Sequence, residues 1–233
     1  MWRETVAGVG ADRRVLTPDF AGFGGTDPRT DEPSLDRFAE EVFALLDREG
    51  FRSAVLAGLS MGGYVAMACL RQQPERVQAL VLADTKASAD PPDGRQKRLA
   101  MAGRLEVEAS TDALLAGVLS ALVGPTTRQS RPEVLARVTD AVRAASPRAA
   151  AWAQRAMAAR PDSLHELAAF PGPALVVRGD EDELSTAADA DAMATALPDG
   201  RLVTLPRAGH LPAIEVPDDF ARALREFLAE VAQ

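Results

Sequence analysis

Short, nearly continuous apolar runs alternate with stretches that have a helical repeat along much of the chain. The runs are residues 14–19 (RVLTPD), 54–59 (AVLAGL), 79–83 (ALVLA) and 174–177 (ALVV), with 201–205 (RLVTL) as a further candidate. Runs of this kind are typical of parallel strands that are buried on both faces. The alternation predicts an α/β fold with about five strands in a mostly parallel sheet covered by helices.

Two segments have the spacing of amphipathic helices that pack on such a sheet. Within residues 34–49, apolar side chains recur every three or four positions, Ser34 is placed to cap the N-terminus, and Gly50 is placed to end the helix. Residues 217–231 repeat the pattern with Phe220, Leu224 and Phe227 after Pro217 near the start.

Between residues 87 and 170 the alternation breaks. This segment is rich in Ala, Arg and Leu, has helical spacing, and contains no convincing strand. Pro125, Pro132, Pro147 and Pro161 are expected to divide it into about four helices, because proline opens or ends a helix. We therefore expect one domain over residues 1–233, with a helical insertion at 87–170.

Composition and charge argue against several classes of partner and site. The 233 residues carry a formal net charge of -8 without an acidic tail, which argues against nucleic acid. Cys69 is the single cysteine, so an intramolecular disulfide and a paired metal-thiolate site are excluded. There is no apolar run of eighteen residues, and residues 1–20 carry charges where a signal peptide needs an apolar core. These features predict a cytoplasmic protein that binds no membrane.

The strongest local signal is residues 58–63 (GLSMGG), which directly follow a predicted strand and precede a helical stretch. A serine on such a sharp strand-to-helix turn is exposed as a nucleophile. Glycines are expected on both sides of Ser60, because a larger side chain would collide with the turned backbone. The helix N-terminus favours developing negative charge, and the backbone N–H of Met61 is a candidate oxyanion donor.

A serine nucleophile needs a base that is oriented by an acid. Of the two histidines, His210 lies in a loop after a predicted strand, whereas His165 lies among apolar residues near the end of the helical insertion. His210 is therefore the preferred base, and His165 is expected to be structural or exposed. The loop 179–182 (GDED) also follows a strand and offers Asp180, Glu181 and Asp182 as candidate acids. The order along the chain is serine, acid, histidine.

Taken together, these motifs resemble those of the α/β-hydrolase superfamily, and the resemblance covers essentially the whole length of the sequence. The matching segments are 18–27 (PDFAGFGGTD), 58–63, 74–77 (PERV), 179–182 and 208–210 (AGH), in the order that the family has them. The resemblance selects Asp182 as the acid, three residues after the glycine, with Asp180 as the alternative. It also implies that residues 87–170 form a cap over the site and that no metal or organic cofactor is required.

The residues beside Ser60 look like those of the enol-lactonase, carboxylesterase and cofactor-free haloperoxidase branch. The resemblance implies hydrolysis of a small carboxylic ester or lactone through an acyl-enzyme, with Ser60, Asp182 and His210 as the triad. Leu59, Trp152 and Met157 are candidate substrate contacts, as are Met101 and Leu122; alternatively, the cap residues simply pack the helices together. The competing readings are an acyltransferase or perhydrolase, and a non-catalytic ligand-binding protein or inactive fragment.

The resemblance also leads us to expect that the N-terminal part of the family fold is missing from this chain. In the family, three further strands and a His-Gly loop that supplies a second oxyanion donor precede the strand that 14–19 resembles. Because the third of those strands lies between the fourth and the fifth, we expect either a gap beside 14–19 or a new pairing across it.

Overall fold

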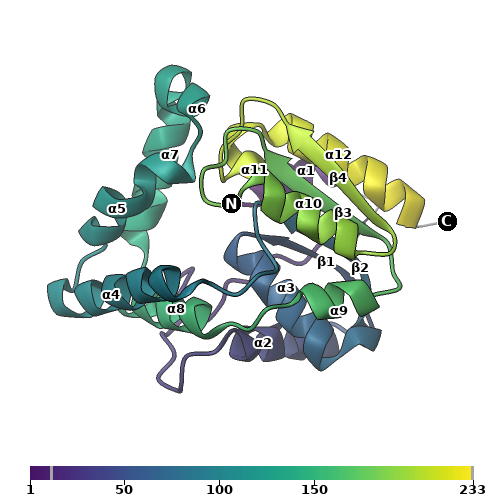
Figure 1. The fold of residues 1–233 in the computed structure, drawn as a ribbon, viewed down its shortest axis with the longest axis horizontal. Coiled ribbons are helices and arrows are strands. Elements are labelled where there is room, and N and C mark those ends of the chain that lie inside the picture. Colours follow the sequence, from purple (N-terminus) through teal and green to yellow (C-terminus); the bar gives the residue numbers. More distant parts are fainter. Residues whose placement is uncertain (11–12, 232–233) are drawn as a thin grey trace.

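A four-stranded parallel sheet forms the centre of the computed structural model, which describes residues 1–10 and 13–231 (Figure 1). Its strands are β1 (Ala54–Leu59), β2 (Val77–Ala83), β3 (Ala174–Gly179) and β4 (Gly200–Leu205). They pair in the order β1-β2-β3-β4, and every pairing is parallel. Within the described residues, no helix is long and apolar enough to cross a membrane.

The two central strands are buried on both faces. Leu80 and Leu82 of β2 point into one hydrophobic cluster, whereas Val81 and Ala83 belong to the cluster on the opposite face. This alternation follows from the two-residue period of a strand. The edge strands β1 and β4 are less buried, because each has a neighbour on one side only.

Helices cover both faces of the sheet. The first cluster lies under α2 (Leu35–Arg48), α3 (Met61–Gln72), α9 (Leu164–Ala169) and α10 (Ala187–Ala196), and the second under α1 (Arg3–Val9), α11 (Pro212–Glu215) and α12 (Pro217–Val231). A 3₁₀ turn, η1 (Pro74–Arg76), leads into β2. The boundaries expected for α2 are confirmed: the Ser34 hydroxyl accepts a hydrogen bond from the Asp36 N–H, and Gly50 follows the helix in the left-handed conformation.

The segment between β2 and β3 forms helices without a strand, all of it within the described residues. The helices are α4 (Pro92–Glu108), α5 (Asp112–Leu122), α6 (Pro125–Ser130), α7 (Pro132–Ala144), α8 (Pro147–Ala159) and α9. Pro125, Pro132 and Pro147 each open a helix, as expected. The expected number of about four is too low, because α4 ends at a left-handed Ala109 that no proline announces. In Figure 1, α4–α8 form a group beside the sheet, with α6 near α11.

The strand expected at residues 14–19 is absent, which also makes the expected count of about five strands wrong. This segment is irregular, and among the described residues no strand pairs with the free edge of β1. It does run close to the start of β1, since Arg14 pairs with Glu49 and lies 4.7 Å above the Phe51 ring. An apolar run becomes a strand only when its N–H and C=O groups have a ladder partner, and the described part of the chain offers residues 14–19 none.

Candidate active site

Ser60 occupies a tight turn between β1 and α3. Its backbone has φ 52° and ψ -114°, a conformation that L-residues rarely adopt and that the surroundings must impose. Two contacts hold it: the Ser60 N–H donates to the Ala83 carbonyl over 2.9 Å, and the Thr85 hydroxyl donates to the Ser60 carbonyl over 2.9 Å. The turn therefore projects the Ser60 side chain beyond the carboxyl ends of β1 and β2.

The glycines around Ser60 differ in what they do. A Cβ at Gly58 would overlap the Gly62 carbonyl and come within 2.5 Å of the Gly63 nitrogen, so a side chain is excluded there, as expected. A Cβ at Gly63 would come within 2.6 Å of the Thr85 side chain, a contact that the sequence did not indicate. The expected collision at Gly62 is wrong, because a Cβ there meets nothing within 4 Å.

This difference predicts opposite effects of two similar substitutions. Gly58→Ala should lower the free energy of unfolding by about 3 kcal/mol, because backbone meets backbone and neither can rotate away. Gly62→Ala should leave stability unchanged or raise it by up to about 1 kcal/mol, since alanine is the better helix former. Thermal or denaturant unfolding of the two variants makes the comparison; equal losses would show that the turn is not packed as described.

Ser60, His210 and Asp182 form one chain of hydrogen bonds. His210 Nε2 lies 2.7 Å from Ser60 Oγ, and His210 Nδ1 lies 3.0 and 3.1 Å from the two Asp182 oxygens. Both His210 and Asp182 are 5% exposed. A carboxylate has no proton to give, so Nδ1 carries the hydrogen and donates it to Asp182. Nε2 is then the acceptor for the Ser60 hydroxyl, which is the arrangement that a general base needs.

The surroundings of Asp182 keep its carboxylate charged. Burial by itself raises the pKa of Asp182, but hydrogen bonds from His210, the Ser185 hydroxyl and the Leu184 N–H outweigh it and hold the pKa below its ordinary value. Asp180, the alternative acid, turns away from His210 and accepts from the Ala208 N–H at 3.4 Å. The geometry thus brings Asp182, and not Asp180, to His210.

The sequence also singled out His165 as a structural or exposed histidine and Met61 as an oxyanion donor. His165 is exposed on α9 and makes no contact with the triad within the described residues. Met61 begins α3, and no acceptor for its N–H is found among residues 1–10 and 13–231. That N–H is therefore a free donor next to Ser60, at the positive end of a helix. The described residues contain no group of three His, Cys, Asp or Glu side chains placed to hold a metal ion.

The candidate substrate contacts are engaged in packing. The side chain of Leu59 belongs to the buried cluster under α12. Trp152 donates from Nε1 to the Asp31 carbonyl over 2.9 Å and packs on the Phe38 ring at 5.0 Å between centroids. Met157 packs against the cluster under α2 and α3 and lies 3.5 Å from an Arg98 nitrogen. A role for these three residues in binding substrate stays a prediction.

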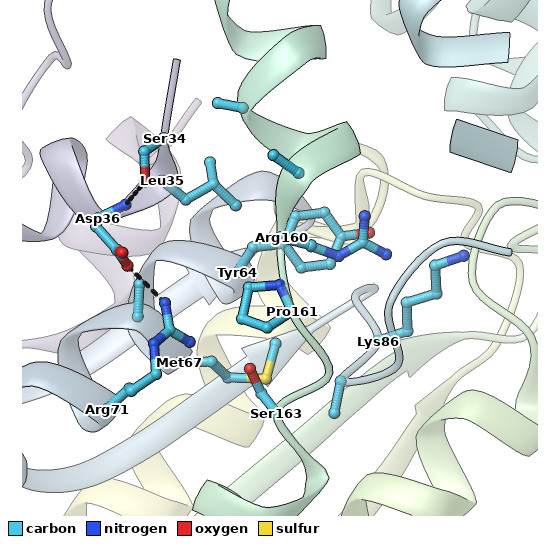
Figure 2. Close-up of a pocket in the computed structure, with 14 residues that line it drawn as sticks. Ser34, Leu35, Asp36, Tyr64, Met67, Arg71, Lys86, Arg160, Pro161 and Ser163 are labelled. Atoms are coloured by element: carbon cyan, nitrogen blue, oxygen red, sulfur yellow. Dashed lines mark hydrogen bonds and ion pairs between the residues drawn. The ribbon is translucent and has the colours of Figure 1, made fainter. Parts of the chain in front are cut away.

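A small cavity of about 120 Å³ lies between α2, α3 and α8, apart from the triad (Figure 2). Its walls include three cationic side chains, and each of them has a carboxylate partner: Arg71 pairs with Asp36, and Lys86 and Arg160 pair with Asp90. Figure 2 shows the Arg160 guanidinium beside the Tyr64 ring, 4.1 Å from its centroid. The Arg71–Asp36 pair joins α3 to α2, and the pairs with Asp90 hold the segment between β2 and α4 against the end of α8. The cavity is therefore explained as a feature of the packing of these elements.

Two glutamates connect the helical insertion to the loops that carry Asp182 and His210: Glu181, which the sequence offered only as a candidate acid, and Glu215, which it did not single out. The Gly124 N–H donates to Glu215 over 2.8 Å, and the Thr126 N–H donates to Glu181 over 2.8 Å. Glu181 precedes Asp182, and Glu215 also accepts from the Leu211 N–H next to His210. The start of α6 is therefore fastened to both loops. No local motif announces this contact, because its two sides are far apart in the sequence.

Comparison with known proteins agrees with this geometry. The model of the "Alpha/beta hydrolase family" matches residues 1–223. The chain is 28% identical to 3-oxoadipate enol-lactonase 1 of Acinetobacter baylyi, over 99% of this chain and 84% of the relative. It is 30% identical to the dihydrolipoyllysine-residue acetyltransferase component of the acetoin cleaving system of Pseudomonas putida, but spans only 59% of that protein. A thermophilic esterase from Thermogutta terrifontis, solved with malate bound, superimposes with a TM-score of 0.94 at 33% identity, covering 100% of this chain and 85% of the esterase.

Proposed function

The chain belongs to the alpha/beta hydrolase family, and from this premise we propose that it is a serine-dependent hydrolase that cleaves a small carboxylic ester or lactone through an acyl-enzyme. The observation that supports this most directly is the continuous hydrogen-bond chain from Ser60 through His210 to Asp182. The relatives named as esterase and enol-lactonase support the substrate class.

In the first half of the reaction, Ser60 Oγ attacks the acyl carbon while its proton passes to His210 Nε2. Asp182 stabilises the imidazolium that forms and keeps the ring oriented. The carbonyl oxygen becomes an oxyanion, and the free N–H of Met61 at the start of α3 donates to it. The C–O bond then breaks, and His210 returns its proton to the leaving oxygen, which departs as an alcohol or stays attached when the substrate is a lactone.

In the second half, water replaces the alcohol. His210 takes a proton from the water, the hydroxide attacks the acyl carbon, and the bond to Ser60 Oγ breaks as the proton returns to the serine. The product is the free carboxylic acid. Every group in these steps comes from the chain, the substrate or water.

A fluorophosphonate probe tests whether Ser60 is activated. We expect one probe per chain, attached at Ser60 and located by peptide mass spectrometry, together with turnover of a short-chain p-nitrophenyl ester. The labelling should be lost in Ser60→Ala and kept in His165→Ala. A folded chain that neither labels nor hydrolyses esters or lactones would favour a ligand-binding protein.

Acyl transfer is the second candidate, because one relative is named as an acetyltransferase component. The same acyl-enzyme would be attacked by an alcohol or a peroxide in place of water. Product analysis with both acceptors present separates the two: a hydrolase yields mainly free acid, and a transferase yields mainly the new ester or peracid.

A further inference from the structure

A second buried carboxyl group lies next to the acid of the triad. Asp84 directly follows β2 and is 1% exposed. One of its oxygens accepts a hydrogen bond from the Gly179 N–H over 2.8 Å. Its other oxygen, Oδ2, is buried and has no donor among the described residues. Because β2 and β3 are neighbours in the sheet, the bond to Gly179 places Asp84 beside the loop that carries Asp182, and the two carboxyl groups are close enough to interact.

Two interacting carboxyl groups in a buried site do not both stay charged, so one of them holds a proton. The hydrogen-bond donors around the two carboxyl groups decide which of them holds the proton. Asp182 accepts from the Leu184 N–H, from the N–H and hydroxyl of Ser185, and from His210. Asp84 accepts from a single N–H. The charge is therefore far better stabilised on Asp182, and the proton belongs on the unpartnered oxygen of Asp84.

We propose that Asp84 is a neutral carboxylic acid that donates its proton to the Asp182 carboxylate and thereby positions Asp182 against His210. The inference rests on the proposed function, since a positioning role needs Ser60 and His210 to perform the chemistry. The hydrogen bond satisfies the otherwise orphaned oxygen of Asp84 and adds one more donor to the carboxylate that orients the base.

The surroundings of Asp84 favour its neutral, protonated form. Burial, followed by the neighbouring Asp182, raises the pKa of Asp84 well above its ordinary value of 3.8 despite the Gly179 N–H. The positive charge of Arg178 opposes the rise. However, Arg178 donates to the Asp182 carbonyl at 3.1 Å, and no ion pair joins it to Asp84 within the described residues.

The pH profile of kcat/KM for a small ester distinguishes a neutral Asp84 from a charged one. Asp84→Asn keeps the size, the acceptor for Gly179 and a donor toward Asp182, and it changes no charge if Asp84 is neutral. We expect its acidic limb within about 0.3 pH unit of the wild type. If Asp84 were charged, the variant would remove an anion near the imidazolium, and the limb would move about one unit or more to lower pH. That shift would overturn the proposal.

Asp84→Leu is the matched variant that has no donor. Asp182 then loses a hydrogen bond and holds the imidazolium more strongly, so we expect the acidic limb to move to higher pH. Because Asp182 is also no longer positioned against His210, we expect kcat/KM above the limb to fall about tenfold. Loss of the Gly179 acceptor alone would lower stability without moving the limb. A limb unchanged from the wild type would therefore contradict the positioning role.

A titration of the wild-type protein needs neither variant to fold and no activity. Carbon-13 NMR of labelled aspartate carboxyls should show Asp84 protonated through neutral pH, while an Asp84 resonance that titrates near 3.8 would overturn the proposal. If the wild type hydrolyses nothing, the proposed function fails, and this titration still decides the state of Asp84.

Discussion

Ser60→Ala is expected to lower kcat for a small ester by about a millionfold while leaving the fold intact, because the acyl-enzyme can no longer form. The Ser60 hydroxyl makes one described contact, to His210 Nε2, so its removal should change the free energy of unfolding by about 1 kcal/mol or less. Turnover under saturating substrate and thermal unfolding measure the two effects. Substantial turnover by the purified variant would mean that another group is the nucleophile.

The two histidines supply the control for this result. His210→Ala should match the loss in Ser60→Ala, because nucleophile and base act as one unit. His165→Ala changes an exposed side chain on α9 and should keep most of the activity. If the two histidine results were reversed, the base would be His165, and the observed hydrogen bond between His210 and Ser60 would have no catalytic meaning.

Local sequence patterns were sufficient to predict which residues meet beside the Ser60 turn, although their catalytic roles stay a proposal. The order strand, Gly58, Ser60, helix predicts the sharp turn, and residues at the carboxyl ends of strands predict Asp182 and His210. Asp84 ends β2 just as Asp182 lies beyond β3, so the same argument could have singled it out. The role of Asp84 depends on β2 and β3 being neighbours in the sheet, and the order of the strands along the chain does not specify this.

The predictions that were wrong depended on contacts between distant segments. Residues 14–19 have the composition of a strand, but pairing makes a strand, and no described strand lies beside β1 on that edge. Gly62 fits the motif, yet a Cβ at this position meets nothing within 4 Å, which the motif alone does not indicate. The direction of the Leu59 side chain, into the cluster under α12, likewise depends on which face of the sheet that helix covers, and a contact of Leu59 with substrate stays a prediction.

Asp182→Asn is expected to lower kcat by about ten-thousandfold, because the amide no longer fixes the His210 tautomer that accepts the Ser60 proton. Both Asp182 oxygens accept backbone N–H groups, from Leu184 and from Ser185, so an amide nitrogen on either side faces a donor. The variant should therefore also lose about 1–3 kcal/mol of stability. That loss cannot explain a ten-thousandfold effect in a protein that is still folded at the assay temperature.

Asp180→Asn is the matched control for this prediction, since it makes the same chemical change in the same loop. Among the described residues, the Asp180 side chain accepts only a long hydrogen bond from the Ala208 N–H, at 3.4 Å, and has no hydrogen bond to His210. Its substitution should reduce kcat by no more than a few fold. An active Asp182→Asn beside an inactive Asp180→Asn would transfer the acid to Asp180. If both variants were nearly fully active, His210 would need no acid partner, and Asp84 would have no triad carboxylate to position.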